Sequence, residues 1–150
     1  MDNRPAPETD WNNDRRSFNN VAELYDLYRP SYPRELVESV LSITHIRPIG
    51  RILEIGSGTS NATRLFAEKG FEIHCIEPGE NLNRVAMRSL KGITRVTFEQ
   101  VRFEEWNGGS NLFDLVISAQ AFHWIDPDIG YRKAASALMA DGHIALFWNM

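Results

Sequence analysis

The chain has 150 residues, of which 43% are hydrophobic and 24% charged, and its formal net charge is −4. This length supports one domain with a single core, and the scattered Lys and Arg residues give no electrostatic reason to expect binding to nucleic acid or to an acidic membrane surface. The single cysteine excludes a disulfide framework or cysteine-based zinc site, and no apolar run approaches the roughly 18 residues of a membrane span. The N-terminus lacks a signal-peptide pattern, so we expect a cytoplasmic protein. We also expect no metal site, since no metal-ligand spacing is found.

The N-terminal part of the chain divides into an arm and two helices. Residues 1–16 are rich in Asn, Asp, Pro and Arg, which predicts a mobile arm. The domain proper therefore spans residues 17–150. Apolar residues at helical spacing predict a helix from Ser17 to about Tyr28, and a second helix over residues 34–42. The prolines between them break the first helix, since each disfavours helix at the residue before it.

From residue 51 onward, strands alternate with helices. The fourth strand is almost wholly apolar, as a strand buried on both faces should be, and Asp114 is expected to fix its start. This alternation predicts a doubly wound, Rossmann-like α/β sheet of five parallel strands in the order 3-2-1-4-5, with right-handed crossovers. The expected strands are 51–55, 71–76, 94–98, 113–118 and 143–148, and the helices between them are 61–69, 81–90 and 131–139.

The most informative segment is the glycine-rich turn after the first strand, Leu53-Glu-Ile-Gly-Ser-Gly58. The strand stops at an acid, and two glycines spaced by one residue follow before a helical pattern begins. Strand, tight turn and helix in this order are typical of a nucleotide-like ligand bound at the carboxyl edge of a parallel sheet. Glycine lets the backbone turn sharply and lets a ligand approach without meeting a Cβ atom. An ordinary tight turn would also explain these two glycines.

Four stretches in order resemble one known family. They are Tyr28-Arg-Pro-Ser-Tyr-Pro33, Leu53-Glu-Ile-Gly-Ser-Gly58, Ile76-Glu-Pro78 and Asp114-Leu-Val-Ile-Ser-Ala-Gln-Ala-Phe-His-Trp124. From about residue 18 to 149 the chain resembles the class I methyltransferases that use S-adenosylmethionine (SAM). The similarity is to the methyltransferase type 11-like group that includes trans-aconitate methyltransferase-like proteins. The resemblance implies SAM as the cofactor and a small molecule as the methyl acceptor.

The resemblance assigns the cofactor's amino-acid tail and ribose to the ends of the first two strands. Glu54 would stand near the ammonium group, and Gly56, Ser57 and Gly58 would give the ligand backbone room. Glu77, at the end of the second strand, would accept both ribose hydroxyls. The alternatives are that Glu54 merely caps the turn and that Glu77 is a solvated acid.

Other residues are assigned to the rest of the cofactor. Leu82 is expected as an apolar contact from the following helix, and Phe103 and Glu104 lie in the loop that adjoins adenine in related enzymes. Arg29 would bind the SAM carboxylate, because a guanidinium suits a carboxylate through two parallel hydrogen bonds. For Leu82 and Phe103 plain core packing is the competing interpretation, and for Arg29 it is a solvated surface turn.

The methyl acceptor is expected beside the end of the fourth strand, where Gln120, His123 and Trp124 follow one another. His123 is a candidate general base, because the unperturbed pKa of histidine lies near neutrality. It is equally a candidate for orienting the acceptor, or a structural histidine. Aromatic ring faces near Trp124 would favour the sulfonium charge.

Three functions follow from these residues. An active SAM-dependent methyltransferase, with a carboxylate or other small-molecule oxygen as acceptor, comes first. A SAM-binding module that is inactive alone or requires a partner is the alternative. An NAD(P)-dependent oxidoreductase is disfavoured, because Glu54 would repel a pyrophosphate and because Asn61 stands where its fingerprint needs glycine. Ser60 departs from the family, which commonly has a third glycine there.

The predicted fifth strand lies near the C-terminal end of the sequence. Members of the resembled family continue beyond the fifth strand through another helix and an antiparallel strand pair. An apolar strand at a sheet edge tends to associate unless it is covered. We therefore expect either a piece of a longer chain or a homodimer that pairs through this edge.

Overall fold

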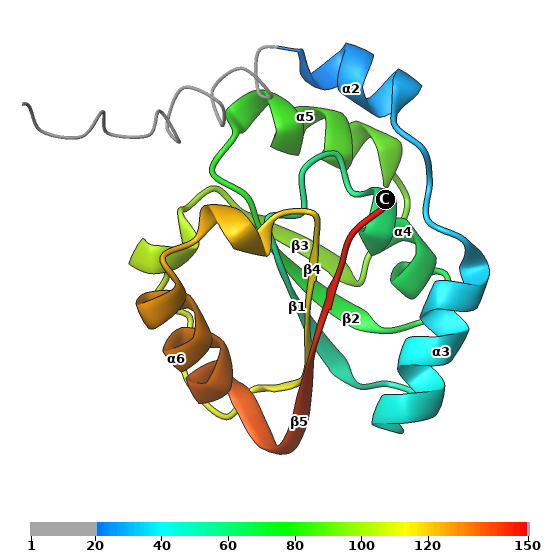
Figure 1. Cartoon of the computed structure of the whole chain (residues 1–150). Coiled ribbons are helices and arrows are strands. Elements are labelled where there is room, and N and C mark those ends of the chain that lie inside the picture. The colour runs from blue at the N-terminus through cyan, green and yellow to red at the C-terminus, as the bar shows by residue number, and fades with distance from the viewer. Residues whose placement is uncertain (1–20, 150) are drawn as a thin grey trace, which may run out of the picture.

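The computed structural model describes residues 21–149, in which a five-stranded sheet is covered by helices (Figure 1). All four strand pairs are parallel and the order is β3-β2-β1-β4-β5, which confirms the predicted sheet. The predicted arm and the start of the first helix lie outside the described residues. The strands are β1 (Arg51–Ile55), β2 (Glu72–Ile76), β3 (Val96–Glu99), β4 (Phe113–Ala119) and β5 (Leu138–Phe147).

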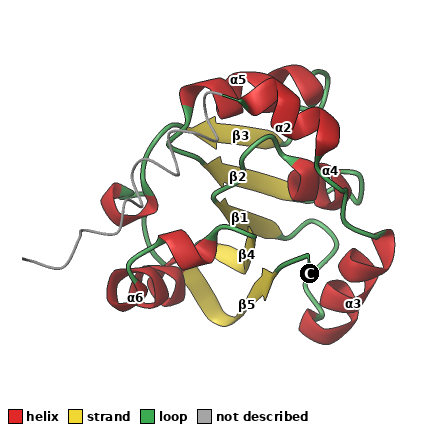
Figure 2. Ribbon diagram, turned by 45° about the horizontal axis from the view of Figure 1, so that its top comes forward, coloured by secondary structure: helices red, strands yellow, loops and turns green. Residues whose placement is uncertain are grey.

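Helices cover both faces of the sheet (Figure 2). One core cluster joins the sheet to α3 and α4, and the other joins the opposite face to α6 and the loop after β3. The helix α2 packs on α5 through Ala22, Leu82 and Val85. The helices are α2 (Ala22–Tyr28), α3 (Arg34–Thr44), α4 (Asn61–Ala67), α5 (Glu80–Ser89) and α6 (Pro127–Ala137), with short 3-10 turns at Phe103–Glu105 and Phe122–Trp124. None of the helices in this described part has the length and apolar character needed to cross a bilayer.

The register brings three strand ends to one edge. Ile55 pairs with Ile76, and the pairing continues into the turn, where the Gly56 amide donates to the Ile76 carbonyl at 2.8 Å. On the other side, the Ser118 hydroxyl donates to the Ile55 carbonyl at 2.8 Å. The turns that follow β1, β2 and β4 therefore leave the sheet together, as parallel strands require.

Asp114 fixes the opposite end of β4. Its carboxylate accepts from the Arg51 amide at 2.8 Å and from two guanidinium nitrogens of Arg47, at 3.1 and 3.3 Å. The residue therefore lies at the amino end of the sheet, away from the turns at the carboxyl edge. This agrees with its expected role at the start of the strand.

Two boundaries near the C-terminus differ from the prediction. The helix α6 begins at Pro127 rather than 131, because the Asp126 side chain caps it by accepting from the Asp128 amide and because proline suits the first helical position. Strand β5 begins at Leu138, with an irregularity in which Phe113 pairs with Leu138 and Leu115 with His143. From His143 onward it follows the prediction, at the edge of the sheet. Association through this edge stays a prediction.

Candidate functional site

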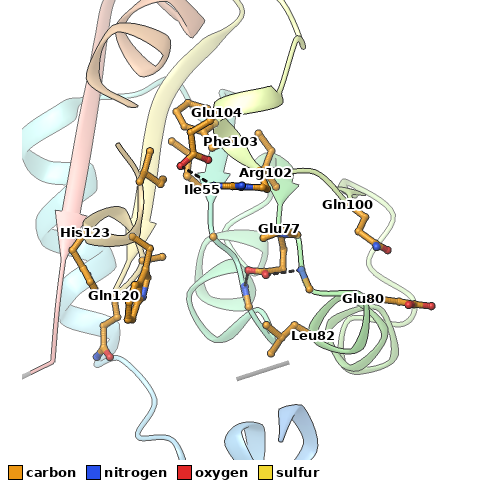
Figure 3. A pocket seen from close by; sticks show the side chains of 18 of the residues that line it. Ile55, Glu77, Glu80, Leu82, Gln100, Arg102, Phe103, Glu104, Gln120 and His123 are labelled. Carbon is orange, nitrogen blue, oxygen red and sulfur yellow. Dashed lines mark hydrogen bonds and ion pairs between the residues drawn. The ribbon is translucent and has the colours of Figure 1, made fainter. Parts of the chain in front are cut away.

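A cavity of about 650 Å³ opens at the carboxyl ends of β1, β2 and β4. This size is within the range of small-molecule sites. Figure 3 shows Phe103 and Glu104 at one end, Leu82 at the other, Glu77 between them, and Gln120 and His123 on the side of β4. Ten of the predicted site residues line the cavity: Arg29, Gly56, Gly58, Glu77, Leu82, Phe103, Glu104, Gln120, His123 and Trp124. The other two, Glu54 and Ser57, are buried residues outside this lining.

The two glycines of the turn differ in what surrounds them. Both have positive φ, +69° at Gly56 and +55° at Gly58, which favours glycine. A Cβ on Gly56 would lie 2.5 Å from the Cβ of Ala121, in the loop after β4, whereas a Cβ on Gly58 would meet nothing within 4 Å. Gly56 is therefore needed for packing of the β4 loop, and Gly58 leaves open space beside the cavity.

Ser60 occupies a position that suits the family's third glycine. Its φ is +73°, in the left-handed region, and the residue is buried. Left-handed backbone costs a non-glycine residue roughly 1 to 2 kcal/mol. Ser60 thus adopts a backbone conformation that glycine would adopt without this cost.

Glu77 is fixed by the two turns that it joins. Its carboxylate accepts from the Gly58 amide at 3.0 Å and from the Gly79 amide at 2.9 Å. The Asn83 side chain donates to the Glu77 carbonyl at 2.8 Å, so the backbone is held as well. Both carboxylate oxygens are thus held in place at the wall of the cavity.

Glu54 lies behind the glycine-rich turn and is 1% exposed. It accepts a hydrogen bond from the Thr63 hydroxyl. Burial raises the pKa of Glu54 to about 8, against the lowering effect of the Thr63 hydrogen bond; Glu77 raises the pKa further and Arg29 lowers it. A cationic group brought close to this carboxyl would favour its ionised form.

The loop after β3 forms the apolar end of the cavity. Phe103 is buried and stacks on Trp106, with ring centroids 5.9 Å apart. Lys133 of α6 donates to the carbonyls of Phe103 and Glu104, at 3.1 and 2.6 Å. A flat apolar ring face in a fixed loop can receive a planar heterocycle.

The loop after β4 presents the polar side chains on the other wall. Gln120 has φ +53°, a strained conformation for a residue with a side chain. Its backbone N–H donates to the Phe147 carbonyl at 2.9 Å. The Trp148 indole donates to His123 Nδ1 at 3.1 Å. Because an indole nitrogen can only donate, Nδ1 is the acceptor and the proton of the neutral imidazole lies on Nε2.

Tyr32, Arg102 and Ala121 are among the residues in or beside the site that the sequence analysis did not assign. Tyr32 is 4% exposed and accepts a hydrogen bond from Arg29. Arg102 lines the cavity beside Glu104, and Ala121 is the reason for Gly56. Tyr32 lies in the quoted stretch Tyr28–Pro33, where it precedes a proline, so the sequence pointed to this segment. Nothing local in the sequence indicates that Ala121 packs against Gly56.

The two glycines generate a prediction on stability. Gly56→Ala should lower the free energy of unfolding by about 2 to 5 kcal/mol, because backbone strain adds to the overlap with Ala121. Gly58→Ala, the matched control, should lose only about 1 to 2 kcal/mol from strain. Urea unfolding followed by circular dichroism measures both. Equal losses in the two variants would contradict the packing role of Gly56.

Glu54 generates a prediction on pH dependence. Its pKa in the folded protein, about 8, lies above the ordinary 4.5, so folding favours the protonated form. Its contribution to stability is complete below about pH 4.5 and is lost as the pH rises toward about 8, at roughly 1.4 kcal/mol per unit of pKa difference. Glu54→Gln keeps an oxygen for Thr63 and removes the titration. Urea unfolding across this range should therefore show a flatter pH dependence for the variant, and parallel curves would contradict the assignment.

Comparison with known families agrees with this geometry. Residues 52–142 match the model of a family described as methyltransferase domain. An uncharacterized methyltransferase of Mycobacterium tuberculosis is 29% identical over 135 residues, which cover 89% of this chain and 52% of that protein. A Saccharomyces cerevisiae protein named a probable S-adenosylmethionine-dependent methyltransferase is 29% identical over 130 residues, or 83% of this chain and 43% of that protein. The chain thus spans about half the length of the curated relatives it matches.

Solved structures share the fold. A SAM-dependent methyltransferase of Leishmania major superposes with a TM-score of 0.74 and 18% identity, covering 96% of this chain and 63% of the other. A Haemonchus contortus phosphoethanolamine N-methyltransferase, solved with S-adenosylhomocysteine, gives a TM-score of 0.76 and 22% identity, covering 97% and 37%. The chain therefore belongs to the methyltransferase domain family, and its sheet has the fold of the class I methyltransferases, whose cofactor is S-adenosylmethionine.

Proposed function

We propose that this protein transfers a methyl group from SAM to a small-molecule acceptor, with an oxygen atom as the favoured target. One observation carries the proposal. The Glu77 carboxylate, oriented by two glycine amides, stands in the wall of a cavity large enough for a nucleoside with a tail. A paired diol is the ligand group that matches a fixed carboxylate at this position.

The residues around the cavity fit the whole cofactor. Glu77 would hold the ribose hydroxyls, with Leu82 beside them, and Phe103 and Glu104 would flank the adenine. The open space at Gly58 admits the ligand against the backbone. The proposed ligand contacts thus run along the cavity from the apolar loop to the glycine-rich turn.

The amino-acid tail of the cofactor carries a carboxylate and an ammonium group, and the site offers a side chain of opposite charge for each. Arg29 lines the cavity and supplies a guanidinium for the carboxylate, while Glu54 lies close enough to Arg29 and Glu77 for their charges to influence its pKa. The ammonium group of the ligand would favour the ionised form of Glu54, directly or through water. A buried acid with a raised pKa is suited to this exchange of a proton for a cation.

Methyl transfer from SAM needs little acid–base chemistry from the protein. SAM supplies an activated methyl group on a sulfonium centre. The chain's residues would hold the acceptor in line with that group and exclude water. Gln120, His123 and Trp124 stand on the cavity wall where this alignment would occur, and the ring faces near Trp124 would favour the cation.

The hydrogen bond of Trp148 to His123 favours an oxygen acceptor. With Nδ1 occupied, the neutral ring offers an Nε2–H donor, which suits a carboxylate or another oxygen better than it suits an amine. The Haemonchus neighbour is named for N-methylation, so a nitrogen acceptor is the competing choice within the same fold. In our proposal His123 orients the acceptor and does not remove a proton.

A SAM-binding module without activity of its own is the second candidate. The observation behind it is the covered length, since about half of each curated relative has no counterpart in this chain. Elements supplied elsewhere, in a longer chain or in a partner, would then complete the acceptor wall. Both candidates require the same cofactor site.

Ligand titration tests the cofactor. By isothermal titration calorimetry the protein should bind S-adenosylhomocysteine, and Glu77→Gln should weaken that binding about 10- to 100-fold, because hydrogen bonds to a charged acceptor contribute about 1.5 to 3 kcal/mol. Glu80→Gln, a neighbouring acid that also lines the cavity, is the matched control and should change the affinity little. Binding of NAD in place of S-adenosylhomocysteine would contradict the proposal.

Turnover with SAM and a panel of carboxylic acids and phenols tests the role of His123. For the acid that reacts fastest, His123→Ala should lower kcat/KM about 10- to 100-fold through loss of a hydrogen bond to an anion. His123→Gln should retain more activity because its amide still donates. For the wild type we expect no rise in rate through about pH 6.5. A rise there, with Gln as poor as Ala, would mean that His123 is a general base.

A further inference from the structure

The segment between α2 and α3 contains two polar residues that each precede a proline. Arg29 stands before Pro30, and Tyr32 before Pro33. A residue before proline is restricted to extended backbone, which narrows the directions available to its side chain. The sequence therefore restricts the backbone of both residues before any tertiary contact forms.

The Tyr32 side chain packs against the sheet and α4. It is 4% exposed and clusters with Ala62 of α4 and Ala119 of β4. Its ring meets Phe147 of β5 edge to face, with centroids 5.2 Å apart and planes at 85°. These contacts need only an aromatic ring, so phenylalanine would satisfy them equally.

The hydroxyl of Tyr32 has a separate environment. Arg29 Nη2 donates to it at 3.2 Å, and the side chain of Gln120 lies beside it. Burial raises the pKa of the phenol, and the charge of Glu54 raises it further, whereas Arg29 lowers it. The hydroxyl therefore stays neutral and is a permanent acceptor for the guanidinium at neutral pH.

We infer that Tyr32 is a positioning residue for the cofactor's amino-acid tail: its hydroxyl holds the Arg29 guanidinium at the cavity wall in the orientation that receives the tail carboxylate. This inference rests on the proposed function, since it assumes the SAM tail at Arg29. A guanidinium carries five N–H donors in a rigid fork, so fixing one edge orients the others. A flexible arginine would lose more side-chain entropy on binding than one already held.

Two ligands separate the tail from the rest of the cofactor. S-adenosylhomocysteine carries the amino-acid tail, whereas 5′-methylthioadenosine keeps the nucleoside and the sulfur without it. By calorimetry, Tyr32→Phe should bind S-adenosylhomocysteine about 5- to 20-fold more weakly, the range expected from one hydrogen bond to a charged group. Its affinity for methylthioadenosine should not change. Tyr28→Phe, at an exposed tyrosine that ends α2, is the matched control and should match the wild type for both ligands.

A double-mutant cycle tests whether Tyr32 acts through Arg29. Arg29→Ala should weaken S-adenosylhomocysteine binding, and adding Tyr32→Phe should weaken it no further. Additive losses would overturn the inference, as would an unchanged affinity in Tyr32→Phe. Equal losses for both ligands, or a variant that does not fold, would show that the hydroxyl supports the fold instead. If the wild type binds neither ligand, the proposed function fails first and the inference fails with it.

Discussion

The hydrogen bonds from Gly58 and Gly79 to the Glu77 carboxylate hold the site together. They join the turn after β1 to the turn after β2 and aim one acid at the cavity. Because an ionised carboxylate accepts hydrogen bonds and does not donate them, this arrangement suits a ligand group that donates, and we propose that the ribose hydroxyls are that group. The remaining features of the cavity, from the ring of Phe103 to the guanidinium of Arg29, lie around that fixed acid.

The glycine-rich turn also connects the cavity wall at Glu77 to the wall formed by the loop after β4. Gly56 lies against Ala121, so the loop that carries Gln120 and His123 can approach only because residue 56 has no side chain. Tyr32 joins the same region from the N-terminal segment, through Arg29 on one side and Gln120 on the other. Three segments that are distant in sequence thus meet at the carboxyl edge of the sheet.

Much of this architecture could be predicted from the sequence, because the signals are local. The apolar run of β4 indicates a strand buried on both faces, and the acid at position 77 follows the second strand at the expected place. The cap at Asp126 and Pro127 was also readable, although the prediction placed the helix start later. The contact of Ala121 with Gly56 could not be predicted, since it depends on how two separate turns pack. The role of Tyr32 could not be predicted, because its hydrogen bond with Arg29 and its burial against Phe147 depend on how this segment packs on the sheet.

The most direct measurement is a crystal structure of the protein with S-adenosylhomocysteine. We expect the ribose hydroxyls on the Glu77 carboxylate, the adenine beside Phe103 and the tail carboxylate at Arg29. A nucleoside bound in another orientation, with its ribose hydroxyls away from the Glu77 carboxylate, would contradict this assignment.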